Sequence, residues 1–136
     1  MLAIILCNAM YVSSTMDFIN WKTQIRKGYL ELCLLALIRG QGKLYGFDII
    51  EQLKKLGFHI KEGTLYPILN RMTLDGILSA EWETQNLKGH PRKFYSLTAQ
   101  GESFFTKMAE EFQDMINLFS LIKNHTGELY DEPKSK

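Results

Sequence analysis

The stretch that decides the fold of this chain runs Lys61-Glu-Gly-Thr-Leu-Tyr-Pro-Ile-Leu-Asn-Arg-Met-Thr-Leu-Asp-Gly76 and continues as Gly89-His-Pro-Arg-Lys-Phe-Tyr-Ser-Leu-Thr-Ala-Gln-Gly101. Its first part places apolar residues at helical spacing, namely Leu65, Ile68, Leu69 and Met72. Thr64 is positioned to cap this helix, and Pro67 falls within its first turn, where a missing N–H is harmless. Asp75-Gly76 is typical of a helix end. We therefore predict a helix over residues 63–74.

A β-hairpin is predicted after this helix. Two short runs rich in Ile, Trp, Phe and Tyr lie between Ile77 and Leu97. They flank Gln85-Asn-Leu-Lys-Gly-His-Pro91, a polar segment with Gly and Pro that is too long for a two-residue turn. The pattern indicates a hairpin with a mobile loop.

Helical segments are also predicted upstream. A short amphipathic helix fits residues 17–27, a nearly all-apolar core helix fits residues 29–39, and a third helix fits residues 46–56. The run Gly40-Gln-Gly42 ends the second of these, and Gly57 ends the third. The helices at residues 29–39, 46–56 and 63–74, followed by the hairpin, give the winged-helix order. We therefore predict a mainly helical α+β fold with a winged helix-turn-helix.

The last predicted helix, residues 99–123 with Thr98 as N-cap, has the sharpest periodicity of the chain. Its apolar residues are spaced 3, 4, 3, 4, 3, as in a helix that packs lengthwise on another: Phe105, Met108, Phe112, Met115, Phe119 and Ile122. We therefore expect residues 17–98 to form the DNA-binding domain, with the short leading helix, and residues 99–123 to form a dimerisation helix. Residues 124–136 are expected to be a disordered tail.

The order and spacing of several pieces together resemble the PadR family of bacterial transcriptional regulators, from about residue 28 to residue 119. The pieces are Gly28-Tyr-Leu-Glu-Leu-Cys-Leu-Leu-Ala-Leu-Ile38, Tyr45-Gly-Phe-Asp-Ile49, Gly63-Thr-Leu-Tyr-Pro67, Asp75-Gly76, and Pro91-Arg-Lys-Phe-Tyr-Ser-Leu-Thr98 with Gly101. The resemblance implies a winged helix-turn-helix with a C-terminal dimerisation helix. It also implies binding of operator DNA, usually with repression.

Charge is distributed as a DNA-binding protein requires. Residues 39–97 hold nine Lys and Arg against six Asp and Glu, whereas residues 98–136 hold four against seven. The predicted DNA module is thus basic and the last helix acidic, which suits a molecule that approaches phosphate with one end. The excess is small, so it supports the motif order without replacing it.

Candidate DNA contacts follow from the helix and the hairpin. Asn70 and Arg71 carry groups that pair with adenine and guanine edges, while Thr64 and Tyr66 hydroxyls are common phosphate donors. Cations of the hairpin suit the minor groove or the backbone, and residues before the helix at Gly46 suit phosphate binding at its N-terminus. The alternative is that the polar residues of the helix are simply solvated, and that the Lys residues at the edge of the hairpin prevent aggregation. The candidate set is Lys43, Tyr45, Lys61, Thr64, Tyr66, Asn70, Arg71, Lys88, His90, Arg92 and Lys93.

The apolar seam of the last helix, residues 105–122, is predicted to form a homodimer interface together with Trp21. The dimer is expected to bind a pseudo-palindromic DNA site. Regulators that this chain resembles are often released from DNA by a small aromatic or cationic amphiphile near the dimer axis, and many carry Trp where this chain has Phe112. The candidate effector pocket is Trp21, Phe105, Met108, Phe112 and Met115. Two alternatives stay open, because these residues could be only an interface core, or the chain could be a winged-helix protein-interaction module without DNA binding.

Enzyme signatures are missing from the sequence. The run Gly40-Gln-Gly-Lys-Leu-Tyr-Gly46 has the wrong spacing for either a P-loop or a dinucleotide fingerprint. The histidines at 59, 90 and 125 lie far apart, with no paired Cys or His at metal-ligand spacing. We therefore expect no catalytic site, metal or cofactor.

The N-terminus and the cysteines bear on location. Leu2-Ala-Ile-Ile-Leu6 invites a signal-peptide interpretation, but no Lys or Arg precedes it and it is far too short to span a bilayer. The interpretation we favour is that residues 1–16 are an extension, disordered or not native, with Met16 as the true start. Cys33 falls in an apolar run and is expected to be a core thiol, which fits a cytoplasmic protein.

Overall fold

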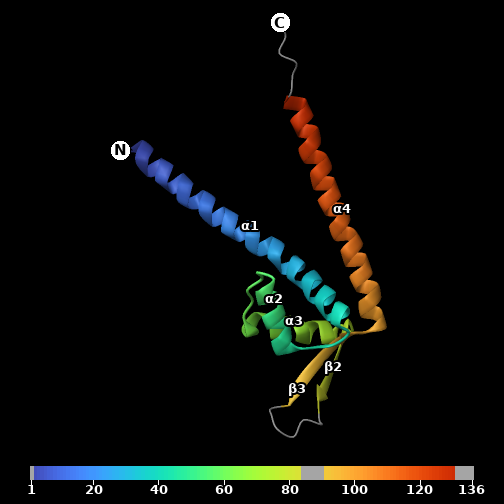
Figure 1. The fold of residues 1–136 in the computed structure, drawn as a ribbon. Helices are drawn as coiled ribbons and strands as arrows, with labels where there is room; N and C mark the ends of the chain where they lie inside the picture. The colour runs from blue at the N-terminus through green and yellow to red at the C-terminus, as the bar shows by residue number, and fades with distance from the viewer. Residues whose placement is uncertain (1, 84–90, 131–136) are drawn as a thin grey trace.

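The computed structural model describes the backbone of residues 2–83 and 91–130 and the side chains of residues 17–83 and 91–125. Its elements, in chain order, are α1 (Leu2–Gln41), β1 (Leu44–Tyr45), α2 (Gly46–Lys55), α3 (Glu62–Leu74), β2 (Leu78–Glu83), β3 (Arg92–Leu97) and α4 (Ala99–Tyr130). Figure 1 shows α2, α3 and the hairpin gathered at one end, from which α1 and α4 diverge toward the two termini. The expected winged helix-turn-helix with a long C-terminal helix is confirmed.

Helix α1 replaces the two helices expected at residues 17–27 and 29–39. Gly28 lies inside it without a positive φ, and a single helical Gly costs only about 1 kcal/mol, too little to end a helix. The helix begins at Leu2, within the segment expected to be an extension. Helix α4 likewise continues beyond the expected end at residue 123 to Tyr130, because no Pro blocks it over that stretch.

The core lies where α1, α2, α3 and the sheet meet. Its buried side chains come from every one of these elements: Leu30, Leu34, Leu35, Ile38, Leu44, Ile49, Leu53, Leu65, Leu69, Met72, Ile77, Leu78 and Tyr95. Fully burying one such side chain is worth about 1.5–3 kcal/mol, so this cluster dominates the stability of the domain. It holds the recognition helix α3 against the wing.

The sheet has the strand order β1-β3-β2, with both pairs antiparallel. Strand β1 was not predicted, since its two residues are too short to show a period. In the register, Tyr45 faces Phe94 across one pair, and Glu83 faces Arg92 across the other. Residues 84–90, which connect β2 to β3, lie outside the described part, and so does the expected mobile loop.

The start of α3 differs from the prediction. Helix α3 begins at Glu62, and its N-cap residue is Lys61, not Thr64. The backbone carbonyl of Lys61 accepts the first helical hydrogen bonds, from the N–H groups of Thr64 and Leu65. A carboxylate in the first turn is favoured by the helix dipole, which explains the earlier start. Pro67 is consequently the sixth helical residue, and it leaves the carbonyl of the exposed Gly63 without its helical donor.

The end of α3 and the start of α4 agree with the prediction. Gly76 adopts φ 76°, a value that favours glycine, and lets the N–H of Ile77 donate to the carbonyl of Met72 at 2.9 Å. Thr98 caps α4, because the N–H of Gly101 donates to its Oγ1 at 2.9 Å. The same hydroxyl donates to the carbonyl of Gly76 at 2.6 Å, which joins the end of α3 to the start of α4.

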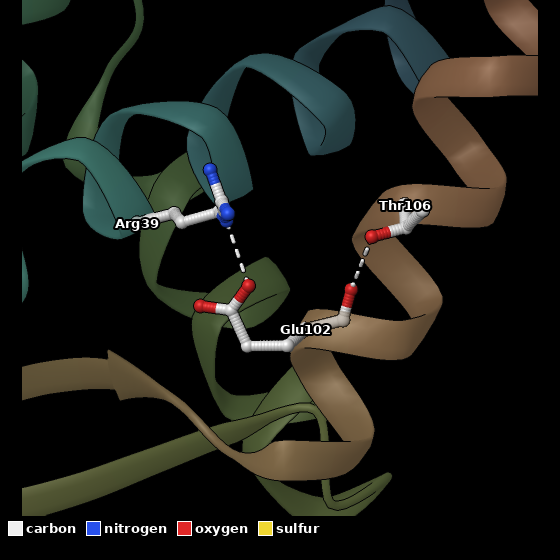
Figure 2. Close-up of polar contacts among 3 residues, drawn as sticks. All are labelled: Arg39, Glu102 and Thr106. Atoms are coloured by element: carbon white, nitrogen blue, oxygen red, sulfur yellow. Dashed lines mark hydrogen bonds and ion pairs between the residues drawn. The ribbon is translucent and has the colours of Figure 1, made fainter.

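Two ion pairs tie α1 to the rest of the molecule. Figure 2 shows Arg39 of α1 donating to the carboxylate of Glu102 on α4 at 2.7 Å, one turn before Thr106. Arg71 on α3 pairs with Glu31 on α1. Both pairs are at least partly exposed, so each adds little free energy but helps to orient the helices.

Candidate nucleic-acid interface

A concave surface lies between the N-terminus of α2, the outer side of α3 and the wing. It encloses about 510 Å³ and is hereafter called the wing groove. Its lining residues are Tyr45, Gly46, Phe47, Asp48, Tyr66, Asn70, Trp82, Pro91, Arg92, Lys93 and Tyr95. The structure thus brings together candidates from all three predicted contact regions.

Helix α3 contributes Tyr66 and Asn70 to this groove. The two residues are one turn apart, so their side chains share a helix face. Gly46 explains how Tyr66 is placed, because a Cβ at that glycine would lie 2.8 Å from the Tyr66 ring. The ring therefore rests on the bare backbone at the start of α2.

The other candidates on α3 lie differently. Lys61 and Thr64 are exposed at the start of the helix and are not groove-lining residues. Arg71 pairs with Glu31 and is thereby directed toward α1. Of the predicted helix candidates, Tyr66 and Asn70 are thus the two that the structure brings into the groove.

The wing cations alternate between the two faces of the hairpin. Lys93 lies with its Nζ 5.5 Å from the centre of the Trp82 ring, directly opposite in the register. Arg92 points to the other face, where its guanidinium lies 5.2 Å from the centre of the Tyr45 ring. Both cations are held near aromatic faces, which reduces the disorder of long side chains. Lys88 and His90 lie outside the described residues.

Lys43 and Tyr45 precede α2, as expected, but both are engaged with the sheet. The Nζ of Lys43 lies 4.5 Å from the centre of the Phe94 ring. The Tyr45 hydroxyl donates to the Glu83 carboxylate at 2.6 Å. This hydrogen bond, with a smaller contribution from burial, raises the pKa of Tyr45 above its ordinary value, so the hydroxyl stays a donor at neutral pH.

Six groove residues were missed from the sequence: Gly46, Phe47, Asp48, Trp82, Pro91 and Tyr95. Phe47 and Trp82 are large apolar residues, yet both side chains are exposed. Trp82 alternates with Glu81 and Glu83 on β2, a hint that it could point to a distinct face. Nothing in the sequence alone indicates that the start of α2 lies beside α3.

A second concave surface lies between α1 and α4. This apolar groove encloses about 660 Å³, and its lining residues are Trp21, Gln24, Ile25, Gly28, Tyr29, Leu32, Met108, Glu111, Phe112, Met115, Ile116 and Phe119. Four of the five predicted effector-pocket residues are among them. Phe105 is not, because it packs against the core and beneath the Arg39 guanidinium, 5.5 Å from its ring centre.

Tyr29 is an aromatic lining residue of the apolar groove that was missed from the sequence. Its ring centre lies 5.5 Å from that of Phe112 and 6.1 Å from that of Phe58. A hydrogen bond with Cys33 raises the pKa of the Tyr29 hydroxyl. Tyr29 was read from the sequence only as the start of a core helix, since periodicity does not show which core residue will border a cavity.

The predicted seam on α4 divides into two parts. Phe105, Met108 and Phe112 are half-buried within the single chain. Met115, Phe119 and Ile122 are 53%, 66% and 53% exposed. Trp21, at 59% exposure, faces the same groove from α1. The single chain therefore presents a continuous apolar surface to its surroundings.

Within the described part of the chain, no helix is long and apolar enough to cross a membrane. No group of His, Cys, Asp or Glu in this part of the chain is arranged to hold a metal ion.

Comparison with known proteins places this geometry in context. The model of the transcriptional regulator PadR-like family matches residues 34–107. A PadR-like transcription factor from Bacteroides fragilis, known from an X-ray structure, is 40% identical with a TM-score of 0.66, over 76% of this chain and 98% of that one. The transcriptional regulator Rv3488 of Mycobacterium tuberculosis is 27% identical over 62% of this chain and 78% of its own length. The transcriptional activator GvpE1 of Halobacterium salinarum is 33% identical over 69% of this chain and 46% of its own length.

Proposed function

The chain belongs to the PadR-like family of transcriptional regulators, and from this premise we propose that it binds a pseudo-palindromic operator as a homodimer and represses transcription until a small molecule releases it. The family assignment makes the protein a DNA-binding regulator and not an enzyme. The observation that carries the proposal is the wing groove, where Tyr66 and Asn70 of α3 face the cations of the wing.

In the proposed complex, α3 enters the major groove. Asn70 is exposed at its outer face and has the paired donor and acceptor that match an adenine edge. Lys61 and Thr64, exposed at the start of α3, are suited to the flanking phosphates. Lys93, with Arg92 on the opposite face of the wing, is suited to the backbone or the minor groove. Arg71 is left out because it already pairs with Glu31.

The proposed dimer uses the exposed apolar surface of α4. Met115, Phe119 and Ile122 have over half their surface exposed in the single chain, and they continue a seam that begins at the core. A second copy that packs lengthwise on this seam would remove these side chains from water. Two recognition helices would then face successive major grooves, about 34 Å apart.

The proposed effector site is the apolar groove. Its volume, about 660 Å³, lies within the range of small-molecule sites, and aromatic rings from both helices line it. Glu111 at its edge would favour a cationic ligand over an anionic one. Because Phe112 stands where many relatives have Trp, we expect a smaller stacking surface. Repression, in place of activation, rests on the family resemblance alone.

A binding assay on the DNA upstream of the protein's own gene tests the proposal. We expect specific retention, with log K falling against log salt at a slope of roughly −5 for a dimer that contacts about six phosphates. Changing Arg92 and Lys93 to Glu should abolish retention while the dimer persists. Lys107→Glu, which reverses a single charge on α4 away from the wing groove, is the control and should retain binding. Absence of binding to any duplex would contradict the proposal.

A further inference from the structure

Glu83 is an acidic residue beside the wing groove, where Asp48 is also acidic but the cations Arg92 and Lys93 are suited to phosphate. It is the last residue of β2, directly opposite Arg92, and its side chain is half-buried. A carboxylate at this place repels DNA, since every negative charge near the duplex opposes phosphate binding. Its position therefore calls for a structural reason.

The reason lies in its partner. Tyr45 is on β1, the opposite edge of the sheet, with β3 between the two residues. The Tyr45 ring stacks on Phe94 of β3 with ring centres 4.0 Å apart, and its hydroxyl continues to the Glu83 carboxylate at 2.6 Å. One side chain thus spans all three strands, through one stacking contact and one charge-assisted hydrogen bond.

The two ends of this contact belong to different parts of the DNA-binding surface. Tyr45 is the residue that precedes α2, and α2 in turn supports Tyr66 of the recognition helix through Gly46. Glu83 is the last residue of β2, the first strand of the wing. Arg92 lies 5.2 Å above the same Tyr45 ring. The Tyr45–Glu83 contact therefore links the residue before α2 to the end of β2.

We propose that Tyr45 and Glu83 are positioning residues that hold the wing at the angle at which its cations and α3 engage one duplex. Neither residue contacts DNA in this scheme, and Glu83 contributes favourably to binding in spite of its negative charge. The inference rests on the proposed DNA-binding function and adds the determinant of wing orientation. Tyr45 was expected from the sequence to contact phosphate, and the inference gives it a positioning role instead.

The inference is tested by whether removing the negative charge of Glu83 weakens or strengthens DNA binding. Glu81 lies two residues before Glu83 on the same strand, and it is the matched control because Glu81→Ala removes the same charge from the same face. Simple electrostatics predicts tighter binding for both variants. We expect Glu81→Ala to bind equally well or more tightly, whereas Glu83→Ala binds roughly tenfold to hundredfold more weakly, as for the loss of about one hydrogen bond to a charged group.

Tyr45→Phe separates positioning from direct contact. It keeps the stack on Phe94 and removes the hydroxyl, so we expect the same weakening with an unchanged salt slope. Loss of a phosphate contact would instead make the slope shallower by about one. The Tyr45→Phe, Glu83→Ala double variant should bind like either single variant, since both break one contact. Glu83→Gln keeps an acceptor oxygen and should recover part of the affinity.

The measurements are fluorescence anisotropy on the upstream duplex at several salt concentrations and thermal unfolding of each free protein. An unchanged unfolding midpoint, together with weaker binding, supports positioning. Tighter binding by Glu83→Ala, or a shallower slope for Tyr45→Phe, overturns the inference while the proposed function stands. If the unmodified protein binds no duplex, both fall.

Discussion

Gly101 in the first turn of α4 lies against the backbone of Ile77, the residue that precedes β2. A Cβ built on Gly101 would lie 2.0 Å from the carbonyl oxygen of Ile77, and that carbonyl also accepts a hydrogen bond from the N–H of Thr98 at 3.1 Å. The two atoms nearest to such a Cβ belong to the Ile77 backbone, which cannot move aside as the end of a flexible side chain could. The close approach of the Ile77 backbone therefore requires glycine at position 101. Gly101 follows Thr98 in the sequence motif because the junction between the wing and α4 lies at this point.

We expect Gly101→Ala to destabilise the protein by about 1–3 kcal/mol or more, the usual cost of overpacking a buried site. Gly40→Ala is the control, because a Cβ there meets nothing within 4 Å and α1 should gain slightly in stability. Chemical denaturation followed by circular dichroism gives both values. Equal stability of the two variants would show that the junction can relax.

Tyr95 provides a pH-dependent prediction at the same scale. Its side chain is buried, and burial, with a contribution from Tyr66, raises the pKa of the phenol above the ordinary 10.0. The folded state thus holds the proton more tightly than the unfolded state. This contribution to stability is complete below pH 10.0 and is lost as the pH rises through the folded-state pKa.

We therefore expect the free energy of unfolding to fall as the pH rises above the ordinary tyrosine pKa. Tyr95→Phe keeps the ring and removes the ionisation, so its stability should fall less steeply over the same range. Denaturant titrations at pH 8 to 12 would measure both slopes. Identical slopes would mean that another tyrosine, such as Tyr29 or Tyr45, accounts for the loss.

At the scale of elements, helices and strand pairs were predictable wherever periodicity or a stop residue marks them. The ends at Gly57 and Asp75-Gly76 and the cap at Thr98 were placed correctly because their chemistry is local. The continuous α1 was not, since one Gly resembles a break but costs little. Strand β1 has only two residues, and what makes it a strand is its pairing with β3, a tertiary fact.

The site was predictable by region more than by residue. Of the residues predicted to contact DNA, Tyr66, Asn70 and Lys93 line the groove that we propose as the DNA-binding surface. Arg71 and Tyr45 carry the right chemistry for DNA, but each is taken by a carboxylate from a segment distant in sequence. No single-sequence pattern could show those partners.

Helix α4 carries the prediction for assembly. Phe112→Ala with Phe119→Ala should give monomers in sedimentation at micromolar concentration, because each buried Phe lost costs about 3–5 kcal/mol. Leu56→Ala, which removes an apolar side chain 75% exposed at the end of α2, is the control and should remain dimeric. A dimeric double variant would place the interface elsewhere.

At the scale of the whole molecule, α1 and α4 start from the winged domain and separate toward their ends (Figure 1). Arg39 and Glu102 join them near the domain, and the apolar groove opens farther along, between Trp21 and Phe119. The arrangement places the proposed ligand site and the proposed partner surface on the same two helices. A ligand in this groove would thus act on the spacing of the recognition helices by altering how two chains meet.

The exposed apolar half of α4 also sets how the regulator responds to its own abundance. If two chains must combine before either recognition helix is correctly spaced, operator occupancy at low abundance rises with the square of the number of chains. A twofold fall in the concentration of the protein would then reduce occupancy about fourfold in the dilute limit. A cell could relieve repression by a modest drop in synthesis, with no ligand present.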